Sequence, residues 1–155
     1  MITGDVLLFF GGNGFVDKEI EHYENSMFTH AAVAIDDKQI IEAWWDGVRV
    51  TTIDGRGPFA IFRADLDAVH QEDIKMFAVG SVGKRYNYEG LVGFLIEKWM
   101  KLKHNPFGSQ HSVWCSQLVF ECFLASGINL VPGKEAEDIT PADLANSPVL
   151  RRVTA

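Results

Sequence analysis

Residues 29–44 read THAAVAIDDKQIIEAW. Two runs rich in small, β-branched and aromatic residues flank the polar triplet Asp36-Asp37-Lys38, which is typical of a β-hairpin with a tight loop. We expect one strand from His30 to Ile35 and the next from Gln39 to Thr52. Such a hairpin needs further elements to cover its apolar side chains.

The length of this loop decides whether the two polar side chains of the hairpin, His30 and Glu42, lie together. With a three-residue loop, Ala32 faces Glu42, and His30 lies on the same face one diagonal step away, about 7 Å between backbones. With a two-residue loop, Glu42 points away. From the pattern alone, Glu42 is equally well explained as an edge-strand charge that prevents aggregation. A histidine at a strand edge is also more often merely solvated or hydrogen-bonded.

The rest of the chain places strands first and helices second. The expected strands are Gly4 to Phe10 and Phe59 to Ala64, with a last edge strand from Val149 to Val153. The expected helices are Gln71 to Val82, Tyr88 to Lys101, a helix from Cys115 that ends before Gly127, and a turn capped by Thr140 and Pro141. This order indicates an α+β domain, with a small antiparallel sheet or partial barrel packed against helices.

The composition narrows the class of protein. The 155 residues are 47% hydrophobic and 23% charged, which fits one globular domain spanning residues 1–155. The net charge of −7 disfavours nucleic acid as a partner. The chain has no apolar run of roughly 18 residues, so we expect no membrane span. Residues 1–10 lack the features of a signal peptide, so we expect a cytoplasmic protein.

The two cysteines have different surroundings in the helix that starts at Cys115. Cys115 lies in the first turn, where the helix dipole favours a thiolate and free N–H groups can stabilise an oxyanion. Cys122 lies deeper and is expected to be an inert core residue, which is also the commoner role for a cysteine on an apolar stripe. Seven residues of helix separate them by about 10 Å, too far for a disulfide. Two thiols are also too few for a structural zinc site, so we expect neither metal nor cofactor.

A nucleophilic thiol needs a base, and His30 is the strongest candidate among five histidines. It opens a strand whose next five residues are small or apolar, where a polar ring needs a specific partner. His111 lies four residues before Cys115, but in a loop with no element to hold it. Glu42 would then orient the base.

Six fragments together resemble a known family. They are GDVLLF (4–9), THAAVAI (29–35), IEA (41–43), GKRYNY (83–88), WCSQLV (114–119) and ITPADL (139–144). In this order the chain resembles the circularly permuted branch of the NlpC/P60 papain-like hydrolases, which includes YiiX/YaeF-like amidases. In that branch the histidine precedes the cysteine, as His30 precedes Cys115. The resemblance implies Cys115 as nucleophile, His30 as general base and acid, and Glu42 as the orienting residue.

The resemblance also implies residues that shape the site. Tyr86 matches a tyrosine that helps to form the site in the family, although it is equally well explained as a buried aromatic residue that bonds a carbonyl. Trp114 and Ser116 flank the cysteine, and we assign them to substrate binding or to the oxyanion site. Gln117 stands where many relatives have glutamate.

The resulting hypothesis is a papain-like cysteine peptidase or amidase that cleaves an amide bond through an acyl-enzyme. The substrate would be a peptide, including a cell-wall peptide reached by phage delivery, a secretion apparatus or lysis. One alternative is a lipid-directed thioester or acyl hydrolase or transferase, with an apolar groove lined by Trp44, Trp45 and Trp114. Another is a non-catalytic module that binds a peptide or acyl chain. The oligomeric state stays open.

Overall fold

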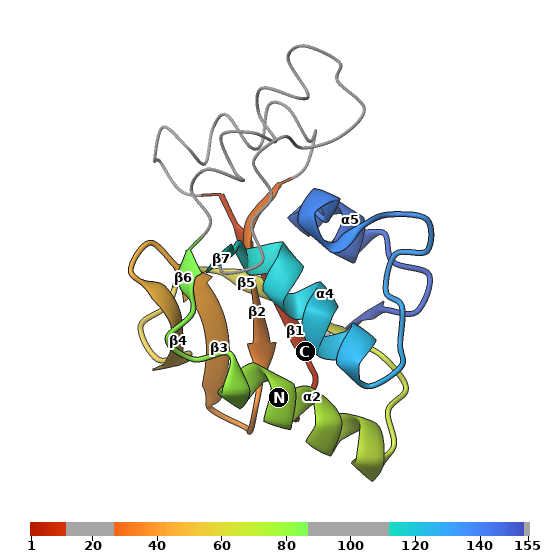
Figure 1. Ribbon diagram of the computed structural model, residues 1–155. Coiled ribbons are helices and arrows are strands. Elements are labelled where there is room, and N and C mark those ends of the chain that lie inside the picture. Colours follow the sequence, from red (N-terminus) through yellow and green to blue (C-terminus); the bar gives the residue numbers. More distant parts are fainter. Residues whose placement is uncertain (12–26, 87–111, 154–155) are drawn as a thin grey trace.

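The hairpin of residues 29–44 lies inside a single antiparallel sheet in the computed structural model, which describes residues 1–11, 27–86 and 112–153. Within these residues the sheet has six strands in the order β4-β3-β2-β1-β5-β8 (Figure 1). The strands are β1 (Val6–Phe10), β2 (Phe28–Ala34), β3 (Gln39–Trp44), β4 (Gly47–Thr52), β5 (Phe59–Arg63) and β8 (Arg151–Val153). Together with the helices, this sheet confirms the predicted α+β class.

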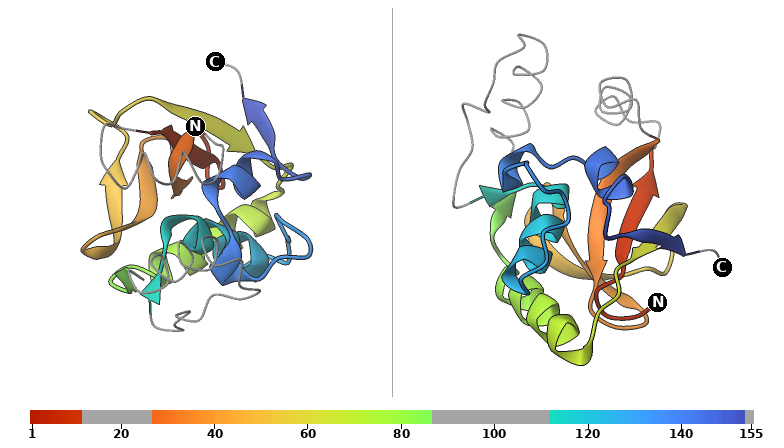
Figure 2. Two further views of the ribbon diagram at one scale, coloured as in Figure 1. Left: turned by 90° about the horizontal axis from the view of Figure 1, so that it is seen from above. Right: turned by 90° about the vertical axis from the view of Figure 1, so that its right-hand side faces the viewer.

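The longer helices cover one face of this sheet. They are α2 (Ala68–Gly80) and α4 (Cys115–Ala125); α4 packs on β2 and β3, and α2 packs beside α4 (Figure 2). Two shorter helical segments, η1 (Ala136–Asp138) and α5 (Pro141–Ala145), contact α4 as well. A short parallel pair, β6 (Arg85–Tyr86) and β7 (Ser112–Val113), leads into α4. The start of α4 is therefore held between this pair and the main sheet.

The central strands are apolar on both faces. Val6 and Leu8 of β1 belong to the cluster that packs with α4, whereas Leu7 and Phe9 pack on the opposite face with Ala32, Ala34 and Ile40. These strands therefore read as nearly continuous apolar runs in the sequence, because burial on both faces removes the alternation. A polar side chain in such a strand needs partners of its own.

Helix α4 forms where its apolar periodicity predicts it. Leu118, Val119, Cys122 and Phe123 are fully buried in the cluster shared with the sheet. Gly127 follows the helix with φ of 84°, and its N–H donates to the Leu124 carbonyl at 2.9 Å. This left-handed residue confirms the predicted C-cap.

The structure corrects two predicted elements. The strand expected from Gln39 to Thr52 is two strands, β3 and β4, that turn at Gly47. Gly47 has φ of 124°, and a Cβ there would lie 2.7 Å from the Lys84 carbonyl oxygen, so the turn requires glycine. The helix expected from Gln71 begins earlier, at Ala68, because the Asp67 carboxylate caps it by accepting the His70 N–H at 2.9 Å.

Other predicted elements agree with the structure or fall outside it. Thr140 caps the start of α5 with Pro141 in the first position, as predicted, and Asp143 completes a capping box. The last strand lies at the sheet edge, as expected, and starts at Arg151. The helix predicted over residues 88–101 lies outside the described residues.

In residues 1–11, 27–86 and 112–153, none of the helices has the length and apolar character that crossing a bilayer would require.

Candidate active site

The β2–β3 hairpin brings His30 and Glu42 into contact. Ala32 lies opposite Glu42, and the Ile35 N–H donates to the Gln39 carbonyl at 3.0 Å, so the loop has the three residues Asp36 to Lys38. The His30 Nε2 and Glu42 Oε2 atoms are 2.8 Å apart. The register on which the sequence prediction depended is therefore the one that places both side chains together.

A β-bulge lies beside His30. In the β1–β2 ladder Phe9 pairs with His30, but Phe10 pairs with Phe28, which leaves Thr29 as the extra residue. A bulge changes the direction of neighbouring side chains. The His30 ring then lies between the rings of Phe9 and Trp44, at centroid distances of 5.5 and 4.9 Å, and only 13% of the side chain is exposed.

Cys115 lies at the first position of α4. Its side chain hydrogen-bonds the His30 ring. Burial opposes a charge on the ring, but the interactions of the ring with Cys115 and with the Glu42 carboxylate outweigh burial and raise the pKa of His30 to about 9.

Glu42 is fully buried and surrounded by donors. Its Oε1 accepts from Arg49 Nε at 3.3 Å and from the Thr51 hydroxyl at 3.1 Å, and its Oε2 accepts from Arg56 as well as facing His30. Burial alone would raise the pKa of Glu42, but the hydrogen bond and charge of His30, with the charge of Arg56, hold it below its usual value. Strand β3 lies between β2 and β4, so the interpretation of Glu42 as an edge-strand charge is wrong.

Sequence reasoning missed both arginines. Arg49 lies directly opposite Glu42 in the β3–β4 register, and Arg56 follows β4 in the next turn. A prediction that runs residues 39–52 as one strand cannot pair Arg49 with Glu42. The signal was the Trp45-Asp46-Gly47 turn, whose glycine marks a hairpin.

The start of α4 supplies backbone donors beside the sulfur. The first helical bond runs from the Leu118 N–H to the Trp114 carbonyl at 3.0 Å, and within the described structure the Trp114 side chain makes no capping bond to the helix. The N–H groups of the first turn therefore lie next to Cys115, where an oxyanion would form.

Ser116 and Trp114 are both buried. The Ser116 hydroxyl donates to the Ile139 carbonyl at 2.6 Å, so this side chain is held in the core. Trp114 is buried, as a core residue would be. Of the two other tryptophans expected at a groove, Trp44 packs edge-on against the His30 ring, and Trp45 is 66% exposed.

The remaining candidates are placed only in part. The Tyr86 backbone pairs with Val113 in the β6–β7 ladder, two residues before Cys115, while its side chain lies outside the described part. His111, the competing base, also lies outside the described residues. Cys122 is fully buried, and burial raises the pKa of its thiol, as expected for an inert core cysteine.

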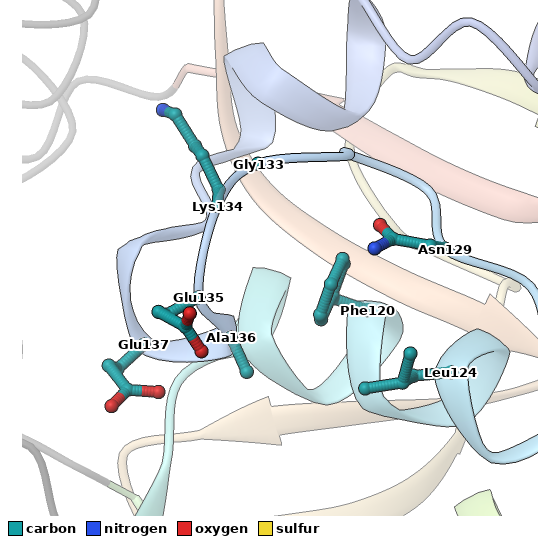
Figure 3. Close-up of a pocket in the computed structure, with 8 residues that line it drawn as sticks. All are labelled: Phe120, Leu124, Asn129, Gly133, Lys134, Glu135, Ala136 and Glu137. Atoms are coloured by element: carbon teal, nitrogen blue, oxygen red, sulfur yellow. The ribbon is translucent and has the colours of Figure 1, made fainter.

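A surface hollow lies away from these residues. It runs along α4 and the following loop and is lined by Phe120, Leu124, Asn129 and residues 133–137 (Figure 3). The one basic group among its lining residues, Lys134, is bonded to the Asp143 carboxylate at 2.8 Å. The candidate residues therefore lie on β2, on β3 and at the start of α4, and not in this hollow.

The fold is similar to that of the crystal structure of metalloprotein yiiX from Escherichia coli O157:H7, DUF1105. The TM-score is 0.75 at 16% sequence identity, over 99% of this chain and 96% of that chain. This identity is low enough that the likeness shows the fold alone. No family model matches the sequence, and no curated protein matches it significantly.

Proposed function

We propose that this protein is a cysteine hydrolase in which Cys115 attacks a carbonyl, His30 transfers the proton and Glu42 orients His30. The observation that carries the proposal is the series of side-chain contacts from Cys115 through His30 to the buried Glu42. A nucleophile, a base and a group that fixes the base are the parts that acyl transfer requires. The order His30, Glu42, Cys115 also supports membership of the permuted papain-like branch.

Each step follows from the groups in place. The Cys115 thiolate attacks the amide carbonyl, and the first-turn N–H groups of α4 stabilise the oxyanion. The His30 imidazolium gives its proton to the leaving amine, which departs as the thioester forms. Neutral His30 then takes a proton from water, the resulting hydroxide attacks the thioester, and the acid product leaves as the thiolate returns. We propose peptide or other amide substrates, with ester or thioester acyl groups as the second class.

A metal-dependent reaction has less support in this chain. The yiiX structure is described as a metalloprotein, but the described residues here contain no group of three His, Cys, Asp or Glu side chains arranged to hold an ion. The proposed steps use only Cys115, His30, Glu42 and the backbone of α4. Stoichiometric zinc in the purified protein would contradict this part of the proposal.

The reactivity of the two thiols tests the proposal directly. Iodoacetamide at pH 7, followed by peptide mass spectrometry, should modify Cys115 at least about tenfold faster than Cys122, because only Cys115 has a base and a helix N-terminus beside it. The variant His30→Gln should slow labelling of Cys115 and leave Cys122 unchanged. Equal, slow labelling of both thiols would instead favour a non-catalytic binding module of the same fold.

Turnover separates the substrate classes. Fluorogenic peptide amides, a cell-wall peptide and an acyl thioester should be compared with wild type, Cys115→Ala and the matched control Cys122→Ala. We expect amide cleavage that Cys115→Ala abolishes and Cys122→Ala retains. Cleavage of the thioester alone would favour the acyl hydrolase or transferase.

A further inference from the structure

Glu42 has more cationic partners than a residue that only orients a histidine needs. Its two oxygens are shared by His30, Arg49, Thr51 and Arg56, although the carboxylate itself is fully buried. The arginine side chains are 33% and 21% exposed, so their charges lie at the border between the site and solvent.

The side chains bonded to Glu42 come from the two neighbouring strands and from the turn after β4. His30 reaches it from β2, Arg49 and Thr51 from β4, and Arg56 from the turn after β4. One further carboxylate, Asp46, lies 3.5 Å from Arg49. Two guanidinium groups therefore face two carboxylates without any contribution from His30.

Arg56 is held by the same rings that hold His30. Its guanidinium lies 5.0 Å from the Phe9 ring centroid and 5.3 Å from that of Trp44. These two rings also contact the His30 imidazole. Stacking on two aromatic faces fixes a planar guanidinium in one orientation, so Arg56 is already positioned before substrate arrives.

This arrangement matters because His30 must alternate between charged and neutral forms during the proposed reaction. When His30 gives up its proton, a buried Glu42 paired with His30 alone would lose its counter-charge, which is costly in a protein interior. It would then tend to take a proton or move away from Nε2. The arginines remain charged throughout and remove that problem.

We infer that Arg56, together with Arg49, is a positioning residue that keeps Glu42 charged and in place while His30 is neutral. This inference rests on the proposed hydrolase function, because only a reacting His30 has to change its charge in each cycle. Neither arginine needs to touch the substrate.

The test compares Arg56→Gln with the charge-retaining Arg56→Lys. An opposite charge at this range lowers the pKa of a carboxyl group by roughly one unit or more, so Arg56→Gln should raise the pKa of Glu42 by about one unit and Arg56→Lys should restore most of it. The pKa is read by carbon NMR of the glutamate carboxyl groups, with Glu42 assigned from Glu42→Gln. In the pH profile of Cys115 alkylation, the pH at which the rate falls on the acid side should rise by the same amount.

Arg63→Gln is the matched control. Arg63 Nε donates to the buried Asp5 carboxylate at 2.6 Å, and this comparable ion pair does not include any residue of the site. Arg63→Gln should lower the stability of the protein and leave the pKa of Glu42 and the pH profile of Cys115 alkylation unchanged. If Arg56→Gln does not fold, Arg49→Gln and Arg56→Lys provide the same comparison. A Glu42 pKa that is equal in Arg56→Gln and wild type, or equally displaced in Arg56→Lys and Arg56→Gln, would overturn the inference. An unreactive Cys115 would refute the hydrolase, whereas the Glu42 titration still reports on the arginines.

Discussion

Replacing Cys115 with alanine should lower the pKa of His30. In the wild-type protein, burial lowers the pKa of this ring, and the charge and hydrogen bond of the Cys115 sulfur are the largest influences that raise it, followed by Glu42. Alanine removes both contributions of the sulfur and leaves burial in place. The pKa should therefore fall from about 9 by at least about one unit, since a neighbouring opposite charge is worth that much or more.

The same shift predicts how stability depends on pH. The pKa of His30 is higher in the folded protein, about 9, than its ordinary value of 6.5, so protonated His30 stabilises the folded state. This contribution is complete below about pH 6.5 and disappears as the pH rises through about 9. The stability that protonated His30 contributes should therefore fall over this range in wild type, and it should fall less in Cys115→Ala, where the raising influence of the sulfur is absent.

Histidine-selective NMR measures the titration of His30 directly. The resonance is assigned by its loss in His30→Gln, and the stability change is followed by urea unfolding between pH 6 and 9.5. Cys122→Ala is the matched control, because it removes a thiol that lies deeper in α4 and should leave the His30 titration unchanged. A His30 midpoint near 6.5 in wild type, or one that is the same in Cys115→Ala, would refute the reasoning.

Two further variants test the surroundings of the site. Glu42→Gln leaves Arg49, Arg56 and His30 around a neutral amide, so the free energy of unfolding in urea at pH 7 should drop by about 3 kcal/mol. Asp46→Asn removes an exposed partner of Arg49 and should change the free energy of unfolding by less than about 1 kcal/mol. Equal losses in the two variants would contradict the importance of burial. Ser116→Ala loses the bond to the Ile139 carbonyl and should lower the free energy of unfolding by about 1–3 kcal/mol in the same assay, with the rate of Cys115 alkylation unchanged. Slower alkylation would show that the Ser116 hydroxyl acts in the site.

The parts of the site that sequence reasoning could predict are those set by local spacing. A helix that starts at Cys115 follows from the apolar repeat, and the contact between His30 and Glu42 follows once the loop length is known. Both depend on neighbours along the chain or across one hairpin, where elementary geometry is sufficient.

The parts that sequence reasoning missed depend on contacts between elements. Arg49 and Arg56 become partners of Glu42 only after the chain turns at Gly47, and the bulge at Thr29 depends on how β1 and β2 fit together. A bulge has no reliable signature in a single sequence, because any residue type can supply the extra position. The contact between Cys115 and His30 likewise joins segments that only the packing of α4 on the sheet brings together.

The loop of the central hairpin connects local turn chemistry to the site. The Asp36 carboxylate accepts the N–H groups of Lys38 and Gln39 at 2.8 and 2.6 Å, and these bonds lower its pKa and hold the loop at three residues. A slip of one residue would exchange the faces of Glu42 and Ile41. The carboxylate would then enter the apolar cluster beneath α4 without its arginines, and an isoleucine would face His30. Folding and the proposed chemistry therefore favour the same register, because a one-residue slip both buries an unpaired charge and leaves His30 without its carboxylate.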